Sequence, residues 1–516
     1  MNGAESLVKT LVNAGVEVCF TNPGTSEIHF VAALDRVEGM RAILGLFEGV
    51  VTGAADGYGR MAEKPAATLL HLGPGLANGG ANLHNAHKAN TPLVNIIGEH
   101  ATYHQQYNAP LHTDIKGLAE PLSHWVDCCT SSDEIAFYGQ QAVQQAMTAP
   151  GKVASLILPA DVSWNENTNG PVDCPPIPRQ IETVPEATIA LLAQVLNEDQ
   201  TTVILMTGQA LSEQGLALGN QIANSCDASL CCELFSAKLA RGVGRAKIER
   251  LPYFGEKVIE RLASVKHLIL VGCSAPVAFF AYPNAESNLV PSDCNVHTLA
   301  TPEQDAIKAL QDLALATHAS ADNIQYYAPH TPELPSGDLN MSSLATTFAA
   351  LLPENAIISD EANTSGAFLF PMSQGCPKHD WLSLTGGAIG QGLPVALGAA
   401  VACPDRKVIS MQADGSAMYT IQSLWTIARE NLDVTVVILA NRSYAILQIE
   451  FARLGAGAPG NKSKSLLDLS NPNLDFVSIA QGMGINASQA SSAEEFNEQF
   501  AEAMNNHGPR LIEAIL

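Results

Sequence analysis

The stretch KVISMQADGSAMYTIQSLWTIARENLDVTVVILANRSY, residues 407–444, decides the fold of the chain. Its apolar runs Val408–Met411 and Val434–Leu439 are rich in Val and Ile, which is typical of buried strands. Residues 421–430, between these runs, have the apolar spacing of an amphipathic helix. Two strands joined by one helix predict a βαβ unit within a parallel sheet.

Each predicted strand is followed by a side chain that carries an oxygen ligand: Asp414 follows the first strand and Asn441 the second. Parallel strands place their carboxyl ends at one edge of the sheet, where α/β folds bind ligands. A carboxylate and an amide oxygen suit Mg²⁺, which keeps coordination positions for phosphate oxygens and water. Gly415 allows a diphosphate to approach the backbone where the helix begins. The stretch therefore predicts a site for Mg²⁺ and a diphosphate.

This stretch resembles the thiamine diphosphate (ThDP) motif, Gly-Asp-Gly followed at a set distance by Asn. The motif belongs to the family that contains pyruvate decarboxylase, benzoylformate decarboxylase and the acetolactate synthase large subunit. Here 25 residues, 416–440, separate Gly415 from Asn441, which fits the spacing. Ala413 replaces the first glycine, and alanine fits there only if its φ angle is negative.

A second Asp-Gly pair in the chain is a decoy for the same motif. Asp56 and Gly57 precede Asn82 at a similar distance. Asn82, however, follows the glycine-rich segment GPGLANGGA, whereas Asn441 follows the β-prone run VTVVILA. Only the downstream pair has the context of a strand end.

Composition narrows the class of protein. The chain has 516 residues, of which 47% are hydrophobic and 15% charged, and its formal charge of -24 excludes sequence-independent binding to nucleic acid. Its 11 cysteines form no CxxC pair, which predicts reduced thiols rather than a disulfide framework or zinc site. The N-terminal residues lack the pattern of a signal peptide, and no apolar run has the length of a membrane span. We expect a cytoplasmic protein with no membrane or nucleic-acid partner.

Two proline-rich stretches, about 166–185 and 319–337, divide the chain into three segments. Each segment alternates short Val/Ile/Leu runs with helical patterns, which predicts an α/β fold of three doubly wound domains with mostly parallel sheets. The resemblance names them as the pyrimidine-binding domain (1–165), the middle domain (186–318) and the diphosphate-binding domain (338–516).

The first segment holds the two predicted catalytic residues, Glu48 and His71. Glu48 opens a helix, where an acid can simply complement the helix dipole. The resemblance instead places it against the pyrimidine nitrogen of the cofactor, where it drives formation of the imino tautomer. His71 ends the strand AATLLH before the glycine-rich turn LGPGLANGG, and it is either a core histidine or, by resemblance, a proton-transfer group.

Two further residues of the first segment are candidates for the substrate pocket. The sequence NPGT, residues 22–25, matches a turn of benzoylformate decarboxylase-like proteins and places the Thr25 hydroxyl near the substrate, although a plain β-turn is the alternative. By the same resemblance His112 lies near the active site. The middle segment has no GxGxxG after a strand, so FAD is unlikely in our interpretation, and Ala281 stands where relatives have a second histidine.

The third segment supplies the predicted cofactor contacts. Asn363 and Thr364 follow a strand, in register with residues that contact the diphosphate in relatives, and they can also cap the next helix. In the glycine-rich turn LTGGAIGQG, the resemblance assigns Ile389 to propping the cofactor into a V shape. That shape brings the cofactor's amine against the reacting carbon, which makes proton removal an intramolecular step. By the same resemblance, Gly387 offers its carbonyl to that amine.

The residues around and after the metal motif complete the predicted site. The resemblance adds the backbone carbonyl of Ser443 as a metal ligand and places Ser416 and Tyr444 near the diphosphate. Ile446 and Glu450, on the next helix, face the substrate in relatives. A carboxylate at Glu450 instead of an aromatic side chain disfavours an apolar aryl substrate, unless the side chain points to solvent.

The segments FEGVVTGAADGYGRM, LLHLGPGLANGGANLHNA and EHATYH look most like the short acetolactate-synthase-like branch. The resemblance implies a ThDP- and Mg²⁺-dependent 2-oxo acid decarboxylase or carboligase, which acts through an enamine and takes a second carbonyl acceptor when it ligates. It also implies a homodimer or homotetramer with active sites between subunits. Two alternatives stay open: a decarboxylase that does not ligate, like benzoylformate decarboxylase, and a weakly catalytic ThDP-binding partner of a fuller synthase. A nicotinamide or flavin oxidoreductase is disfavoured because no dinucleotide fingerprint follows a strand.

Overall fold

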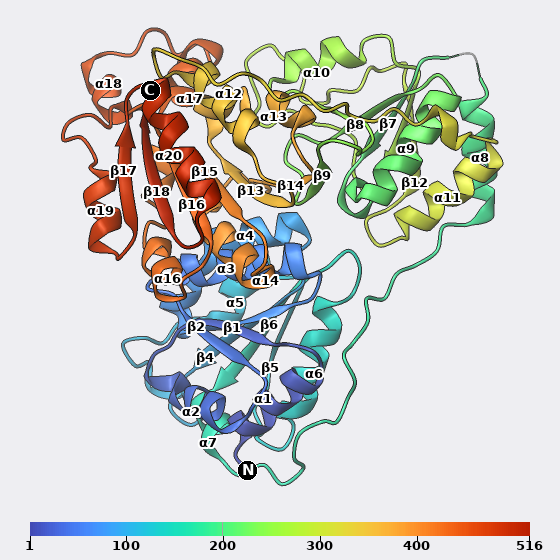
Figure 1. Ribbon diagram of the computed structural model, residues 1–516. Coiled ribbons are helices and arrows are strands. Elements are labelled where there is room, and N and C mark those ends of the chain that lie inside the picture. Colours follow the sequence, from blue (N-terminus) through green and yellow to red (C-terminus); the bar gives the residue numbers. More distant parts are fainter. Residues whose placement is uncertain (199) are drawn as a thin grey trace.

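The computed structural model describes residues 1–198 and 200–516. They form three α/β sheets, each in its own lobe (Figure 1). In this view the first sheet, blue to teal, lies below the second, green to yellow, and the third, orange to red. The predicted α/β fold with mostly parallel sheets is confirmed.

The first sheet has six strands in the order β2-β1-β3-β4-β6-β5, all parallel. Its strands are β1 (Val18–Asn22), β2 (Arg41–Leu44), β3 (Ala66–Leu70), β4 (Leu93–Glu99), β5 (Trp125–Cys128) and β6 (Val153–Pro159). Its helices are α1 (Gly3–Asn13), α2 (Ile28–Arg36), α3 (Glu48–Ala62), α4 (Leu72–Ala89), α5 (Ile115–Ala119), α6 (Ile135–Ala146) and α7 (Ala160–Trp164). The carboxyl ends of β1 to β4 therefore meet at one edge of this sheet.

The second sheet has five parallel strands in the order β10-β8-β7-β11-β12. Its strands are β7 (Thr202–Met206), β8 (Ser229–Cys232), β10 (Glu249–Arg250), β11 (His267–Val271) and β12 (Asn295–Ala300). Its helices are α8 (Glu186–Leu196), α9 (Glu213–Ser225), α10 (Gly255–Leu262) and α11 (Ala306–Ala316).

The third sheet has seven strands in the order β17-β18-β16-β15-β13-β14-β9. Its strands are β9 (Leu239–Arg241), β13 (Ala356–Glu361), β14 (His379–Ser383), β15 (Val408–Ala413), β16 (Val434–Ala440), β17 (Asn486–Ala490) and β18 (Arg510–Ile515). Its helices are α12 (Met341–Leu351), α13 (Leu369–Met372), α14 (Gly392–Ala402), α15 (Asp414–Ala417), α16 (Ser423–Arg429), α17 (Ala445–Arg453), α18 (Asn461–Leu467), α19 (Phe476–Gly482) and α20 (Ala493–Asn505). Only β9, which comes from the middle of the chain, runs antiparallel to its neighbour β14 in this sheet.

The stretch that predicted the fold forms β15, α16 and β16, with the two strands paired in parallel. The helix begins at Ser423 rather than near Ile421, and a separate short helix, α15, directly follows β15. The βαβ prediction is confirmed, with shorter helical bounds.

One local prediction is wrong. The segment LGPGLANGG, expected to be a glycine-rich turn, is the first half of helix α4. Its glycines serve packing: a Cβ added at Gly79 would lie 2.8 Å from the Thr52 methyl group, and one at Gly75 3.3 Å from Glu48 Oε1. The missing side chains let α4 lie close against α3.

Helices α3 and α14 join the first lobe to the third, and glycines allow their backbones to touch. A Cβ at Gly57 would lie 2.1 Å from the Val395 carbonyl oxygen, and one at Gly398 1.8 Å from the Ala54 carbonyl oxygen. The decoy pair of the metal motif lies in this contact: Gly57 packs on α14, and Asp56 bonds to Arg60. The upstream Asp-Gly pair therefore serves the contact between α3 and α14.

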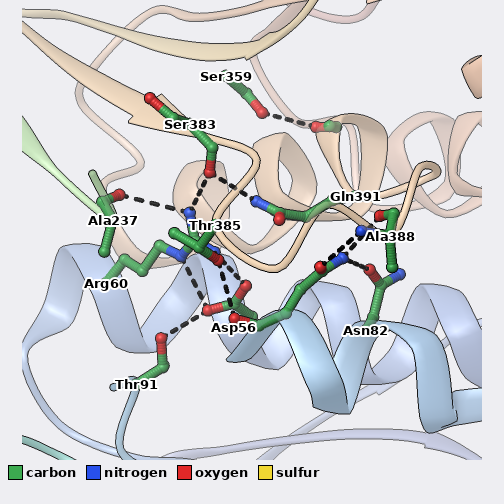
Figure 2. Close-up of polar contacts among 12 residues, drawn as sticks. Asp56, Arg60, Asn82, Thr91, Ala237, Ser359, Ser383, Thr385, Ala388 and Gln391 are labelled. Atoms are coloured by element: carbon green, nitrogen blue, oxygen red, sulfur yellow. Dashed lines mark hydrogen bonds and ion pairs between the residues drawn. The ribbon is translucent and has the colours of Figure 1, made fainter. Parts of the chain in front are cut away.

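Asp56 and Arg60 form a buried ion pair in this contact (Figure 2). Arg60 Nη2 lies 2.6 Å from Asp56 Oδ2, and the two side chains are 1% and 0% exposed. Arg60 Nη1 also donates to the Ser383 carbonyl at 2.8 Å, and Nη2 to Thr385 Oγ1 at 2.9 Å. The pair thus bonds α3 to the last residue of β14 and to the segment that follows it.

Arg60→Met is expected to lower the stability of this contact by about 3–5 kcal/mol, because it leaves the Asp56 carboxylate buried without its cation. The urea midpoint measures the loss. The exposed pair Arg36–Glu5 is the matched control, and Arg36→Met is expected to cost less than about 1 kcal/mol. If Asp56→Asn/Arg60→Met loses as much as the single variant, the unpaired charge is not the cause.

All eleven cysteines are free thiols, and most are buried, which agrees with small hydrophobic side chains in the core. Within residues 1–198 and 200–516, no helix is both long enough and apolar enough to cross a membrane.

Candidate active site

Asp414 and Asn441 lie at the carboxyl ends of the neighbouring strands β15 and β16. Both Asp414 oxygens accept backbone bonds, Oδ1 from Gly415 N at 2.8 Å and Oδ2 from Arg442 N at 2.6 Å. Asn441 Nδ2 donates to Ser365 Oγ at 2.9 Å, while its Oδ1 accepts from Ser443 N at 2.9 Å. The loop after β16 is therefore tied to Asp414, and the two predicted ligands lie at one edge.

Burial raises the pKa of the Asp414 carboxyl, and its two backbone bonds oppose part of that rise. Each carboxylate oxygen has a second lone pair beyond its backbone bond, as does Asn441 Oδ1. In the described residues no group of three or more His, Cys, Asp and Glu side chains could hold a metal. A hard cation bound by one carboxylate, one amide and one carbonyl fits these donors, whereas a zinc-type cluster does not.

The backbone around Asp414 admits the motif as it stands in this chain. Ala413 has φ -70° and ψ 143°, an extended conformation that any residue adopts, so alanine is unstrained there. A Cβ at Gly415 would lie 2.5 Å from the Tyr444 ring. Gly415 is thus required by the close approach of Tyr444, which precedes helix α17.

Polar side chains from the end of β13 complete this edge. Asn363 and Thr364 lie in a short 3-10 helix, Asn363–Gly366, directly after β13. Asn363 Nδ2 donates to Ser416 Oγ at 3.0 Å, across to the start of α15. Asn441 in turn bonds to Ser365 of the same 3-10 helix, so the segments after β13, β15 and β16 meet at this edge.

The turn between β14 and α14, residues 384–391, carries Gly387 and Ile389. Gly387 has φ +75° and Gly390 φ +94°, conformations that favour glycine. A Cβ at Gly387 would lie 2.8 Å from Phe279 Cζ, so an aromatic residue of the middle lobe packs on the turn. Ile389 is half-buried in the same turn.

Glu48 is the first residue of α3, at the carboxyl edge of the first sheet. Glu48 is 8% exposed, and its Oε2 accepts a hydrogen bond from Asn78 Nδ2 of helix α4 at 3.0 Å. The Glu48 carboxyl is therefore buried at the start of α3, and Asn78 is its side-chain partner among the described residues.

His71 directly follows β3 and precedes α4, and it is paired with a residue that sequence reasoning missed. Its Nδ1 lies 2.8 Å from Glu27 Oε2, and the Glu27 side chain is 0% exposed. Gly24 N also donates to Glu27 Oε2 at 2.8 Å. Burial raises the pKa of the Glu27 carboxyl, and His71 opposes part of that rise. Glu27 Oε1 has no hydrogen-bond partner among the described residues.

Glycines make room for this Glu27–His71 pair. A Cβ at Gly24 would lie 2.1 Å from His71 Nδ1, and one at Gly98 1.6 Å from Glu27 Oε1. In the sequence, an acid three residues after Gly24 has the spacing of a helix cap, which it also provides here. The signal that marks it as more than a cap is the burial, which the sequence does not reveal.

The remaining pocket candidates divide into exposed and buried groups. Thr25 and His112 are exposed, and the His112 ring lies 6.4 Å from the His100 ring at the end of β4. Ile446 is half-buried on α17, but Glu450 is only 7% exposed and therefore does not point to solvent. Glu450 Oε1 lies 3.6 Å from Arg453 Nε, which balances part of its charge.

The two predicted halves of the site are not bonded to each other within the chain. Among residues 1–198 and 200–516, no hydrogen bond or ion pair joins Glu48 or His71 to Asp414 or Asn441. Each half lies at the carboxyl edge of its own sheet, the first and the third.

Comparisons with known proteins agree with this arrangement. Residues 1–121 match the model of the thiamine pyrophosphate enzyme N-terminal TPP binding domain, and residues 365–514 that of the C-terminal TPP binding domain. A Mycobacterium tuberculosis protein provisionally named acetolactate synthase large subunit IlvX is 48% identical over 100% of this chain and 99% of its own. Benzoylformate decarboxylase of Pseudomonas aeruginosa is 30% identical over 97% of this chain and 96% of its own.

A solved structure supports the fold. The ThDP-dependent 4-hydroxybenzoylformate decarboxylase of Rhodococcus jostii RHA1 has a TM-score of 0.82 at 22% identity, with 99% of this chain and 98% of that chain covered. The chain has both TPP binding domains of the family and full-length relatives in it. The chain therefore belongs to the thiamine pyrophosphate (ThDP) enzyme family.

Proposed function

We propose that the protein is a ThDP- and Mg²⁺-dependent 2-oxo acid decarboxylase or carboligase of the acetolactate-synthase-like type. One observation carries the proposal: one sheet edge holds a buried Glu48 beside the Glu27–His71 pair, and another holds Asp414 and Asn441 on adjacent strands. The first set suits proton transfer and the second a metal-bound diphosphate. Residues 1–165, 186–318 and 338–516 would be the three domains, and each of them contains most or all of one sheet.

The residues at these two sheet edges fit both Mg²⁺ and ThDP. Asp414, Asn441 and the Ser443 carbonyl would hold Mg²⁺, since they offer only oxygen ligands. The diphosphate would lie against hydroxyl, amide and backbone donors of the same edge, namely Asn363, Thr364, Gly415, Ser416 and Tyr444. Gly387 and Ile389, in the turn after β14, would contact the part of ThDP that carries the pyrimidine ring.

When bound, ThDP supplies the nucleophilic carbon and the electron sink that loss of CO₂ from a 2-oxo acid requires. Glu48 would hold a proton at the pyrimidine nitrogen, in a site that excludes most water. His71 would move a proton to or from the substrate, with its ring held in one orientation by Glu27. Thr25, His112, Ile446 and Glu450 would line the substrate side.

Glu27→Gln is expected to lower kcat at least ~10-fold, because a neutral amide holds and stabilises a protonated imidazole less well than a carboxylate. The limb of the pH–rate profile that depends on this pair should move to lower pH, while ThDP affinity stays unchanged. Glu513→Gln is the matched control, since burial also raises the pKa of Glu513. An unchanged pH profile in Glu27→Gln would show that Glu27 does not act on His71.

We also propose that the active site is shared between two copies of the chain in a homodimer or a dimer of dimers. The absence of bonds between Glu48 and Asp414 within the described chain supports this. Large apolar side chains are exposed near both halves, among them Leu46 and Tyr103 near the first and Tyr419 and Leu447 near the second. Such side chains are suited to an interface that covers both edges.

The direct test of the proposed activity is an assay of the protein with ThDP and Mg²⁺ on a panel of 2-oxo acids. CO₂ release that depends on both additions is expected, and 2-hydroxy ketone formation separates a carboligase from a simple decarboxylase. Tight ThDP binding in calorimetry without turnover of any 2-oxo acid would instead select a weakly catalytic partner protein.

A further inference from the structure

The backbone of the turn 384–391 is held by side chains of helix α4, far away in the sequence (Figure 2). Asn85 bonds to both polar groups of one residue: its Nδ2 donates to the Ala388 carbonyl at 2.8 Å, and its Oδ1 accepts from Ala388 N at 3.2 Å. Ala388 lies between Gly387 and Ile389, the two residues of the turn with proposed cofactor contacts. One amide thus determines where both neighbours of Ala388 lie.

Other α4 residues hold the positions on either side. His84 Nε2 lies 3.0 Å from the Gly386 carbonyl oxygen, and Asn82 Nδ2 lies 3.3 Å from that of Gly390. Asn85 Nδ2 also donates to Asn82 Oδ1 at 2.9 Å, which orients both amides. Helix α4 therefore contacts every second residue of the turn, namely Gly386, Ala388 and Gly390.

A carboxyl group of the third sheet, that of Glu361 in β13, holds the end of the turn. Glu361 Oε1 accepts from Gly390 N at 2.6 Å and Oε2 from Gly392 N at 2.6 Å. Gln412 Nε2 also donates to Oε2 at 2.8 Å. A Cβ at Gly392 would lie 2.3 Å from Gln412 Oε1, so this glycine is required by the contact. The turn is thus fixed between Glu361 and Asn85.

We propose that Asn85 is a positioning residue for the cofactor: it keeps the Gly387 carbonyl and the Ile389 side chain in their working places. Gly387 and Gly390 have positive φ, so this backbone takes no regular structure and depends on such side-chain bonds. The same helix begins after His71 and bonds to Glu48 through Asn78, so within one chain α4 connects the Glu48 edge of one proposed site to the turn of the other. The inference rests on the proposed function, because it takes this turn as a cofactor contact.

Asn85→Asp tests the inference with almost no change of shape. The carboxylate can still accept from Ala388 N, but it faces the Ala388 carbonyl and Asn82 Oδ1 with an oxygen instead of a donor. Hydrogen–deuterium exchange of cofactor-free protein is expected to be ~10-fold faster in the peptide that covers residues 384–392. In the loaded protein, kcat is expected to fall ~10-fold, with ThDP affinity in calorimetry changed less than ~3-fold because the metal edge is intact.

Asn220→Asp is the matched control. Asn220 is also buried and also joins a backbone donor to a backbone acceptor: Gln325 N donates to its Oδ1 at 2.7 Å and its Nδ2 donates to the Lys247 carbonyl at 2.8 Å. It lies in the middle lobe, so Asn220→Asp should lower stability without changing turn exchange or kcat. Asn85→Ala, which removes both bonds without adding a charge, gives the same test if Asn85→Asp does not fold.

Two results separate the inference from the proposed function. If hydrogen–deuterium exchange of the turn and kcat are both as in the wild type in Asn85→Asp and Asn85→Ala, the positioning role is wrong. This holds even if ThDP binds and the substrate is turned over. Failure of the wild-type protein to bind ThDP would overturn the proposed function, whereas faster turn exchange in the cofactor-free variants would still show that Asn85 holds the turn.

Discussion

Glu48→Gln is expected to lower kcat by ~100-fold or more, while ThDP and Mg²⁺ bind with wild-type affinity. Glutamine keeps the shape and can still accept the hydrogen bond from Asn78, but it cannot hold and release a proton at the pyrimidine nitrogen. The loss therefore falls on the chemical step. Steady-state kinetics on the best 2-oxo acid, together with calorimetry of ThDP binding, separates the two quantities.

Asp161→Asn is the control for Glu48→Gln. Asp161 is another buried acid in the first turn of a helix at a strand end of the first sheet, and it accepts from Thr102 N at 2.9 Å. Near wild-type kcat is expected for this variant, because Asp161 has no proposed contact with the cofactor. If Glu48→Gln turns over like Asp161→Asn, Glu48 is only a helix-capping acid.

Asp414→Asn is expected to weaken Mg²⁺-dependent ThDP binding ~100-fold. A ligand present at 100 times its Kd stabilises a protein by about 2.7 kcal/mol, and a variant that binds ~100-fold more weakly retains about 0.4 kcal/mol at the same concentration. Thermal unfolding with and without ThDP and Mg²⁺ measures this difference. A chelator added to the wild-type protein should reproduce the variant, and a variant with unchanged Mg²⁺ dependence would exclude Asp414 as a ligand.

The pH dependence of this binding follows from the same carboxyl. Burial raises the pKa of Asp414 above its usual 3.8, so the folded protein stabilises the protonated acid more than an unfolded chain does. Its contribution to folding is therefore largest at low pH and falls as pH rises through the raised pKa. Mg²⁺ needs the carboxylate, so ThDP binding should weaken as pH falls toward that pKa and strengthen above it.

Local sequence patterns were enough to predict the sheet edge at which Asp414 and Asn441 lie. The strands β15 and β16 and the positions of the two proposed ligands after them follow from apolar runs and from the rule that parallel strands end at one edge. Ala413, the departure from the motif, is accommodated because its φ is -70°. A strand end is a local property, which is why residues 407–444 suffice for it.

Contacts between distant segments could not be predicted in this way. Glu27 has the spacing of a helix cap, and only the folded sheet shows that it is buried against His71. The glycines of α4 suggested a turn, because their use in helix packing depends on α3. The bonds from Asn85 to Ala388 join residues 303 positions apart, and no local pattern in the sequence indicates them.

The most direct test is subunit complementation between Glu48→Gln and Asp414→Asn. Each variant alone should be nearly inactive. In a mixed dimer, one site combines the intact Glu48 of one chain with the intact Asp414 of the other, and the second site carries both changes. Random pairing by coexpression makes about half of the dimers mixed, so the preparation should have about a quarter of the wild-type activity. Mixed dimers isolated through two different affinity tags should have about half of the wild-type activity. Isolated mixed dimers that stay as inactive as either variant would contradict a site formed by Glu48 of one chain and Asp414 of its partner.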